Sequence, residues 1–151
     1  MPPHVTLIYP FTDGDLLAVG RMREAAEVVS RFEAFAYRLV GTARFEDTPP
    51  ILYLSPEPAG PFRALIDALA AAFPDCPPYG GAHSEPIPHV TVAVAADAEL
   101  GAIESEVAAR LPISAHAADV WLMERGPTDT WQLRQRLPLA PSRSVGAQQP
   151  L

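Results

Sequence analysis

The chain has 151 residues, 48% of them hydrophobic and 19% charged, and a formal net charge of −7. This composition is ordinary for a globular protein, and the acidic balance argues against a surface that tracks long nucleic acid through many arginines and lysines. The sequence has no apolar run long enough for a transmembrane helix and no secretory signal pattern, and Cys76 as its single cysteine allows no internal disulfide, so we expect a cytoplasmic protein without membrane contact.

The first half of the chain alternates between extended and helical patterns. Short stretches rich in β-branched and aromatic residues predict strands, and apolar residues that recur three or four positions apart predict helices. In order, we expect a strand at 4–9, a helix at 16–31, strands at 35–45 and 51–54, and a helix at 61–73.

The second half repeats these patterns and ends differently. Asp97 is a plausible cap for a helix, and the Gly-Pro-Thr-Asp sequence at 126–129 is typical of a hairpin turn. The last residues are rich in Ser, Gly, Gln and Pro and predict a disordered tail. In order, we expect a strand at 89–94, a helix at 98–110, antiparallel strands at 113–124 and 130–137, and the tail at 139–151.

One short motif occurs twice in the chain. Residues 3–7 read Pro-His-Val-Thr-Leu and residues 88–92 read Pro-His-Val-Thr-Val. Because successive strand side chains point to opposite faces, the histidine and threonine of each copy share one face while the apolar residues face a core. We therefore expect the two strands to lie together, with their His-Thr faces closing on one phosphate.

The two copies also indicate an internal duplication. In residues 1–48 and in residues 51–138 the motif is followed by a helix and a long strand, but a strand and a helix precede only the second copy. We expect a single domain over residues 1–138 with two interleaved lobes, in which the first repeat lacks its leading strand and helix. Such a fold leaves a sheet edge unpaired beside the first motif, and an exposed edge favours a homodimer.

Paired histidines suit the cleavage of a phosphodiester. Histidine exchanges protons near neutral pH, because its ordinary pKa is about 6.5. One histidine can take a proton from water while the other gives a proton to the leaving oxygen. In this interpretation His4 and His89 are the catalytic pair, and the hydroxyls of Thr6 and Thr91 donate to phosphate oxygens, so that no metal ion or other cofactor is required.

Each candidate residue also has a structural interpretation. A single His-Val-Thr-Val sequence is typical of a half-buried strand, and it is the repetition that favours a site. His83 and His116 are interpreted as a solvated loop residue and a structural strand residue, and a zinc site built from the four histidines has no supporting spacing. Arg44, Arg134 and Arg136 can each supply a cation, but a solvated strand face is the simpler interpretation.

The doubled motif resembles the two-histidine phosphoesterase superfamily, and in particular bacterial 2′-5′ RNA ligase family proteins. The resemblance is carried by the opening Pro-Pro-His-Val-Thr-Leu-Ile-Tyr-Pro-Phe at 2–11, by Tyr-Gly-Gly at 79–81 and by the second motif at 88–92, and it extends over about residues 2–138. It implies a bilobed α+β fold, in which antiparallel sheets with flanking helices are related by a pseudo-two-fold axis around a central cleft.

The resemblance also implies metal-independent chemistry on 2′-5′ or 2′,3′-cyclic phosphodiesters of RNA ends or small nucleotides. By the family pattern, His4 and His89 are the acid–base pair, and Thr6 and Thr91 hold the phosphate. For a 2′,3′-cyclic phosphate it suggests that His89 activates water and His4 protonates the departing 3′ oxygen, although the residues allow the reverse. Tyr79 can either stack on a base or cover the core.

Two hypotheses of other classes stay open beside this one. The first is a non-catalytic module that binds nucleotides or RNA ends in a retained cleft, and the absent leading elements of the first repeat motivate it. The second is a metal-dependent hydrolase, for which the sequence offers histidines but no ligand spacing.

Overall fold

The structure is a computed structural model that describes residues 2–11, 19–82 and 85–142. Within these residues the chain forms three α-helices, one 3-10 turn and six strands, which makes it an α+β protein. In chain order the elements are α1 (Val19–Val29), β1 (Phe35–Phe45), β2 (Ile51–Glu57), α2 (Gly60–Ala72), the 3-10 turn η2 (Pro78–Gly81), β3 (Val90–Val94), α3 (Asp97–Ala108), β4 (Ile113–Ala117), β5 (Asp119–Arg125) and β6 (Trp131–Pro138).

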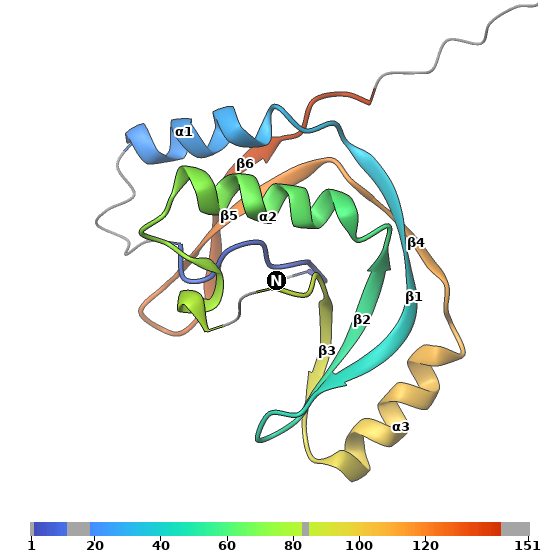
Figure 1. The fold of residues 1–151 in the computed structure, drawn as a ribbon. Coiled ribbons are helices and arrows are strands. Elements are labelled where there is room, and N and C mark those ends of the chain that lie inside the picture. Colours follow the sequence, from blue (N-terminus) through green and yellow to red (C-terminus); the bar gives the residue numbers. More distant parts are fainter. Residues whose placement is uncertain (1, 12–18, 83–84, 143–151) are drawn as a thin grey trace, which may run out of the picture.

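The strands form two antiparallel sheets. The larger has the order β3-β2-β1-β4, and the smaller is the β5–β6 hairpin. Figure 1 shows that the larger sheet curls around α2. The helix α3 lies outside the curl and contacts β1 and β3. Since β4 ends at Ala117 and β5 begins at Asp119, the chain passes from one sheet to the other across a single residue. The two sheets are therefore tied closely together at this point.

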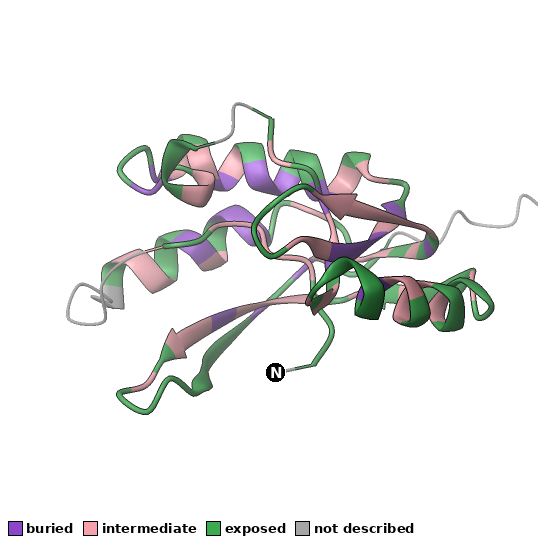
Figure 2. Cartoon of the chain, turned by 90° about the horizontal axis from the view of Figure 1, so that it is seen from below, coloured by how far each residue is buried: buried purple, intermediate pink, exposed green. Residues whose placement is uncertain are grey.

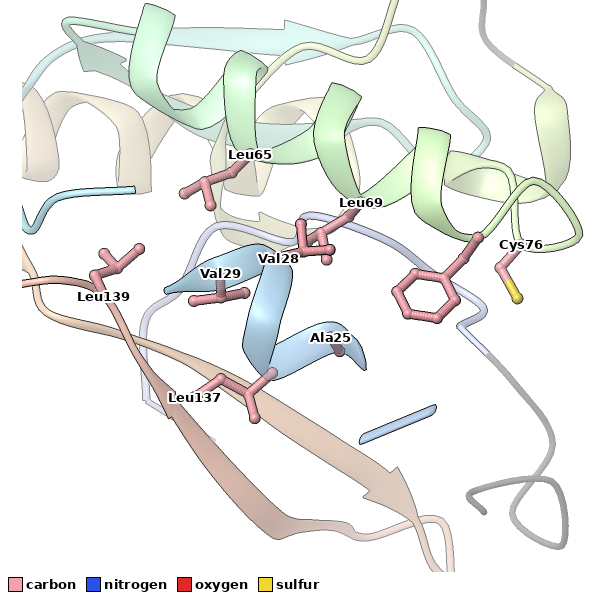
Figure 3. Packing of buried hydrophobic residues seen from close by; sticks show 9 residues of the cluster. Ala25, Val28, Val29, Leu65, Leu69, Cys76, Leu137 and Leu139 are labelled. Atoms are coloured by element: carbon pink, nitrogen blue, oxygen red, sulfur yellow. The ribbon is translucent and has the colours of Figure 1, made fainter. Parts of the chain in front are cut away.

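The main hydrophobic core joins α1, α2 and the end of β6. Leu65 and Leu69 recur on one face of α2, and both are less than 7% exposed. Burying each leucine stabilises the fold by about 1.5–3 kcal/mol, which is why this stripe fixes the helix position. Figure 3 shows the cluster, which comprises Ala25, Val28, Val29, Leu65, Leu69, Phe73, Cys76, Leu137 and Leu139.

A second, smaller core lies on one face of the larger sheet. Leu39, Leu54 and Val90 are its buried members, and Val5 and Val107 pack against them. Val90 thus turns into a core, as the alternation in the second motif predicts, and α3 covers that core through Val107. The other face of β3 is left for the polar side chains of the motif.

The β5–β6 hairpin contrasts with both cores. Residues 131–136 of β6 are all exposed, and Leu137 is the first buried residue of the strand. Figure 2 shows the exposed β6 beside the mostly half-buried β5, in contrast to the buried stripes of α1 and α2. The hairpin contacts the main core through Leu137 of β6 and Val120 of β5.

Most predicted elements are confirmed, and the differences have local causes. The predicted strand at 4–9 is wrong as a continuous element, because only Val5 pairs, in an isolated bridge with Val90. Prolines at positions 2, 3 and 10 have no backbone N–H to donate to a ladder. The predicted strand at 113–124 is two strands, β4 and β5, that belong to different sheets.

Two boundaries also differ from the sequence prediction. Asp97 is not a cap but the first residue of α3, whose N-cap Ala96 makes no side-chain hydrogen bond. The ordered chain runs beyond 138, because Leu139 is buried and the Ala140 amide donates to the carbonyl of Phe32. The rest of the predicted tail, residues 143–151, and the predicted first turn of the helix at 16–31 lie outside the described residues. The internal duplication and its two lobes stay a prediction.

Candidate active site

A single β-bridge brings the two copies of the motif together. Val5 and Val90 pair in antiparallel fashion although they are distant in the sequence. Both valines pack in the smaller core, so the alternation along each segment turns the flanking histidine and threonine to the opposite face. The bridge thus sets the relative position of the two His-Thr faces.

The antiparallel register places unlike residues of the two motifs beside each other. One step from the Val5–Val90 pair, His4 lies beside Thr91 on one side and Thr6 lies beside His89 on the other. All four side chains line one cavity of about 910 Å³. The structure therefore brings together the four residues that the sequence analysis singled out.

Both imidazoles are held by the same backbone contact. His4 Nδ1 lies 2.9 Å from the carbonyl oxygen of Pro2, and His89 Nδ1 lies 2.7 Å from the carbonyl oxygen of Ile87. A carbonyl oxygen only accepts, so Nδ1 of each ring carries the hydrogen. In each histidine Nε2 is then the nitrogen that can take or give a proton.

Aromatic rings enclose His89. The ring of Phe45 meets its imidazole edge to face at 4.9 Å between centroids, and Tyr53 does so at 5.4 Å. Tyr79 lies nearly parallel to the imidazole at 6.5 Å. The His89 side chain is half-buried among these rings, whereas His4 is exposed.

Tyr79 reaches His89 from an unusual backbone conformation. Its φ of 52° and ψ of 35° are left-handed, and Gly80 and Gly81 follow with φ of 63° and 80°. A tyrosine in this region is uncommon and carries strain, whereas the two glycines adopt it freely. Burial raises the pKa of the Tyr79 hydroxyl above its ordinary value. Of the two roles that the sequence left open for Tyr79, its position beside a histidine of the cavity favours one at the site.

The comparison with protein families agrees with this geometry. A family model described as the 2′-5′ RNA ligase superfamily matches residues 1–129, which include both motifs. The chain belongs to the 2′-5′ RNA ligase superfamily. This superfamily is part of the two-histidine phosphoesterases, is generally catalytic and acts on RNA or nucleotide substrates. No curated protein sequence matches the chain with significance.

Membership in the 2′-5′ RNA ligase superfamily confirms the resemblance drawn from the motifs. The α+β class and the curled antiparallel sheet are consistent with its fold. None of the described helices has the length and apolar character needed to cross a bilayer.

Of the two remaining histidines, the structure describes one. His116 is exposed on β4 and lines the cavity, while His83 lies outside the described residues. Among the residues that the structure does describe, no three His, Cys, Asp or Glu side chains gather closely enough to hold a metal ion. The zinc alternative therefore finds no ligand set in this part of the chain.

The arginines considered as substrate cations are engaged in ion pairs. Arg44 contacts Glu104 at 2.7 Å and Asp97 at 3.1 Å, and this group ties β1 to α3. Arg134 pairs with Glu124, and Arg136 lies 3.9 Å from Asp119. None of these three arginines lines the cavity.

Other cavity residues were not found by the sequence analysis. Tyr9, Arg125 and Trp131 line the same cavity, the first from the N-terminal segment and the other two from the hairpin. Arg125 is the partner of Trp131 in the β5–β6 register. A hairpin turn was predicted between these two strands, but no pattern in the sequence indicated that the hairpin reaches the motifs.

Proposed function

We propose that the chain is a metal-independent phosphoesterase that acts on 2′-5′ or 2′,3′-cyclic phosphodiesters of RNA ends or small nucleotides. The observation that carries the proposal is the pairing of the two motifs through Val5 and Val90, which puts two imidazoles and two hydroxyls on one cavity. Superfamily membership supports the substrate class. A single cysteine fits a cytoplasmic location.

The chemistry follows from the nitrogen that each ring leaves available. Nε2 of one histidine takes a proton from water as the water oxygen bonds to phosphorus. Nε2 of the other histidine gives a proton to the ribose oxygen as its bond to phosphorus breaks, leaving a phosphomonoester. The hydroxyls of Thr6 and Thr91 donate hydrogen bonds to the non-bridging oxygens, where negative charge accumulates in the transition state. In the reverse of this step, which releases water and re-forms the phosphodiester, His4 and His89 exchange these roles.

Hydrolysis of nucleoside 2′,3′-cyclic phosphates in the presence of EDTA tests the proposal. His4→Ala and His89→Ala should each lower kcat by about 10²–10⁴-fold, because each removes a general acid or base. His116→Ala is the matched control, since His116 lines the same cavity from β4 outside the motifs, and it should stay within about threefold of the parent. Activity that survives both motif substitutions, or that chelator abolishes, contradicts the mechanism.

The acid and the base can be told apart by the leaving group. A nucleotide p-nitrophenyl phosphodiester releases a phenolate that needs no proton, so the substitution that removes the acid should cost little with this substrate. The substitution that removes the base should still cost its full factor. We expect the pH–rate profile of the parent protein to be bell-shaped on the cyclic substrate and to lose its alkaline limb on the p-nitrophenyl ester.

A second candidate function is a binding module without turnover. It is favoured by the thin support of His4, whose segment pairs with β3 at a single residue. Such a module would be stabilised against heat by nucleoside 2′- or 3′-monophosphates and would form no product. Turnover by the intact chain rejects it. The homodimer suggested by an exposed sheet edge also stays a prediction, and light scattering of the purified protein tests it.

A further inference from the structure

Two exposed aromatic side chains meet at the cavity. Tyr9 is 44% exposed and Trp131 is 36% exposed, and their ring centroids lie 5.9 Å apart at an interplanar angle of 67°. Of the large hydrophobic side chains that are exposed in the described part of the chain, these are the two that line the cavity. Their exposure therefore coincides with the site already described.

A purely structural role does not account for this exposure. Rings that only fasten the N-terminal segment to the hairpin would stabilise the fold most when packed into a core, as the half-buried Phe11 is against the buried Phe73, with 4.9 Å between ring centroids. Tyr9 and Trp131 instead keep more than a third of their surface in contact with water. Open aromatic faces beside a polar site are what planar ligands stack on.

The small number of cations around the cavity also favours a ligand that binds by stacking. Among the described residues that line it, Arg125 is the one arginine or lysine, and Asp129 pairs with its Nε. A protein with so few cations at its site gains little from contacts along a phosphate backbone. Substrate affinity beyond the reacting phosphate must then come from the rest of the nucleotide, chiefly from its base.

We propose that Tyr9 and Trp131 form a platform on which a nucleobase of the substrate stacks, with Arg125 at its edge. This inference rests on the proposed function, and it narrows the substrate to phosphodiesters that carry a base. Tyr9 is five residues from His4, so the two backbones are at most about 18 Å apart. A substrate of one or two nucleotides whose phosphate is bound at the histidines is long enough for its base to span this distance.

Fluorescence tests binding directly, because the chain has two tryptophans. Trp121 also lines the cavity, but its Nε1 donates to Asp119 at 2.7 Å and Arg136 lies over its ring at 4.7 Å, so it is the internal control for a base that stacks on Trp131. Trp121→Phe leaves Trp131 as the sole reporter, and Trp131→Phe leaves Trp121. Titration with adenosine 3′-monophosphate should quench the first variant more strongly than the second. No quenching of the first variant, or equal or stronger quenching of the second, overturns the platform.

Kinetics test what the platform contributes. Trp131→Ala should lower the ratio of kcat/KM for adenosine 2′,3′-cyclic phosphate to that for a base-free methyl riboside 2′,3′-cyclic phosphate by about tenfold, since stacking on one aromatic ring is lost. Tyr9→Ala should lower the same ratio by a smaller factor. Leu133→Ala is the matched control, because Leu133 is 42% exposed on the same strand but does not line the cavity.

The outcomes separate this inference from the proposed function. If both cyclic substrates are hydrolysed and Trp131→Ala leaves their ratio unchanged, the platform is wrong and the phosphoesterase stands. If neither substrate is hydrolysed but adenosine 3′-monophosphate quenches Trp131, the phosphoesterase is wrong and the base site stands. Unchanged thermal midpoints of the alanine variants exclude loss of the fold as the cause of either result.

Discussion

The two sides of the cavity carry the same motif on unequal supports. His89 is followed directly by β3, an edge strand of the four-stranded sheet, and is enclosed by the rings of Phe45, Tyr53 and Tyr79. His4 is exposed on a segment that pairs with β3 only at Val5. Yet each imidazole is fixed by an Nδ1 contact to the carbonyl two residues before it.

The contacts that orient the two imidazoles are therefore different from the contacts that stabilise the fold around them. The shared carbonyl contact orients both rings without help from the surrounding core. The sheet and the aromatic rings hold only the His89 side, so substitutions there should lower the free energy of unfolding as well as the catalytic rate. Substitutions on the His4 side should lower mainly the catalytic rate.

After substitution of the histidines themselves, the largest effect is expected from the motif threonines, where the two sides are chemically equal. Thr6→Val and Thr91→Val keep the side-chain shape but remove a hydroxyl that donates to the phosphate. Loss of a hydrogen bond to a charged group costs about 1.5–3 kcal/mol, so each variant should lose about 10- to 100-fold in kcat/KM. The thermal midpoints should change little, because Thr91 is exposed and Thr6 is half-buried.

Thr42→Val is the matched control for these variants. Its hydroxyl donates to Glu104 at 2.8 Å and does not line the cavity, so it should affect stability and leave kcat/KM unchanged. A large rate loss for only one of the two motif threonines would show that the sides are not equivalent in phosphate binding.

The next largest effect is expected on stability, at the Val5–Val90 bridge that joins the two sides. Val90 is 5% exposed within the smaller core, whereas Val5 is half-buried. Val90→Ala should lower the free energy of unfolding by about 2 kcal/mol, and Val5→Ala by about half as much. Denaturant titration measures both. If Val5→Ala is the more destabilising of the two, the N-terminal segment is held more firmly than a single bridge implies.

A smaller effect is expected from the rings around His89. Phe45→Leu removes the edge-to-face contact at 4.9 Å, and an aromatic contact of this kind is worth about 1 kcal/mol. We expect kcat to fall about fivefold and the imidazole NMR signals of His89, but not those of His4, to broaden. Tyr53→Phe keeps a ring in place and should stay within twofold. Equal broadening at both histidines would contradict the separate support of the two sides.

The sequence predicted that the four motif residues share one cavity better than it predicted how their segments are supported. The His-Thr pairs were visible because the motif occurs twice, and strand alternation turned Val5 and Val90 toward a core. That the first motif pairs at one residue was not visible, because periodicity measures local preference and not which partner strand is available. The neighbouring prolines were the one signal that a ladder would be short.

Contacts between distant elements were the part that the sequence could not supply. Arg44 was a candidate for the substrate until the structure placed it against Glu104 and Asp97 of α3. Tyr9 and Trp131 were not considered, because nothing local marks a residue of a hairpin as facing a segment more than 100 positions away. Such choices depend on how sheets and helices pack, which one sequence read alone does not fix.

The smallest predicted effect tests α3, which covers the core behind His89. Glu104 accepts a hydrogen bond from Thr42 at 2.8 Å and pairs with Arg44 at 2.7 Å. Both contacts hold the pKa of the Glu104 carboxyl below its ordinary value, and the hydrogen bond from Thr42 has the larger effect. A group whose pKa is lowered in the folded state contributes stability above its unfolded pKa, and this contribution is lost as the pH falls through the folded pKa.

Glu104→Gln should therefore lower the thermal midpoint by a few degrees at pH 7, and the gap to the parent should close as the pH falls below about 4. Glu106→Gln is the matched control. Glu106 of the same helix pairs with Arg110 just beyond its end, this pair is about two-thirds exposed, and exposed pairs of this kind contribute little. Its midpoint should follow the parent at every pH. A gap for Glu104→Gln that is constant with pH would mean that packing of the side chain, and not its charge, joins α3 to β1.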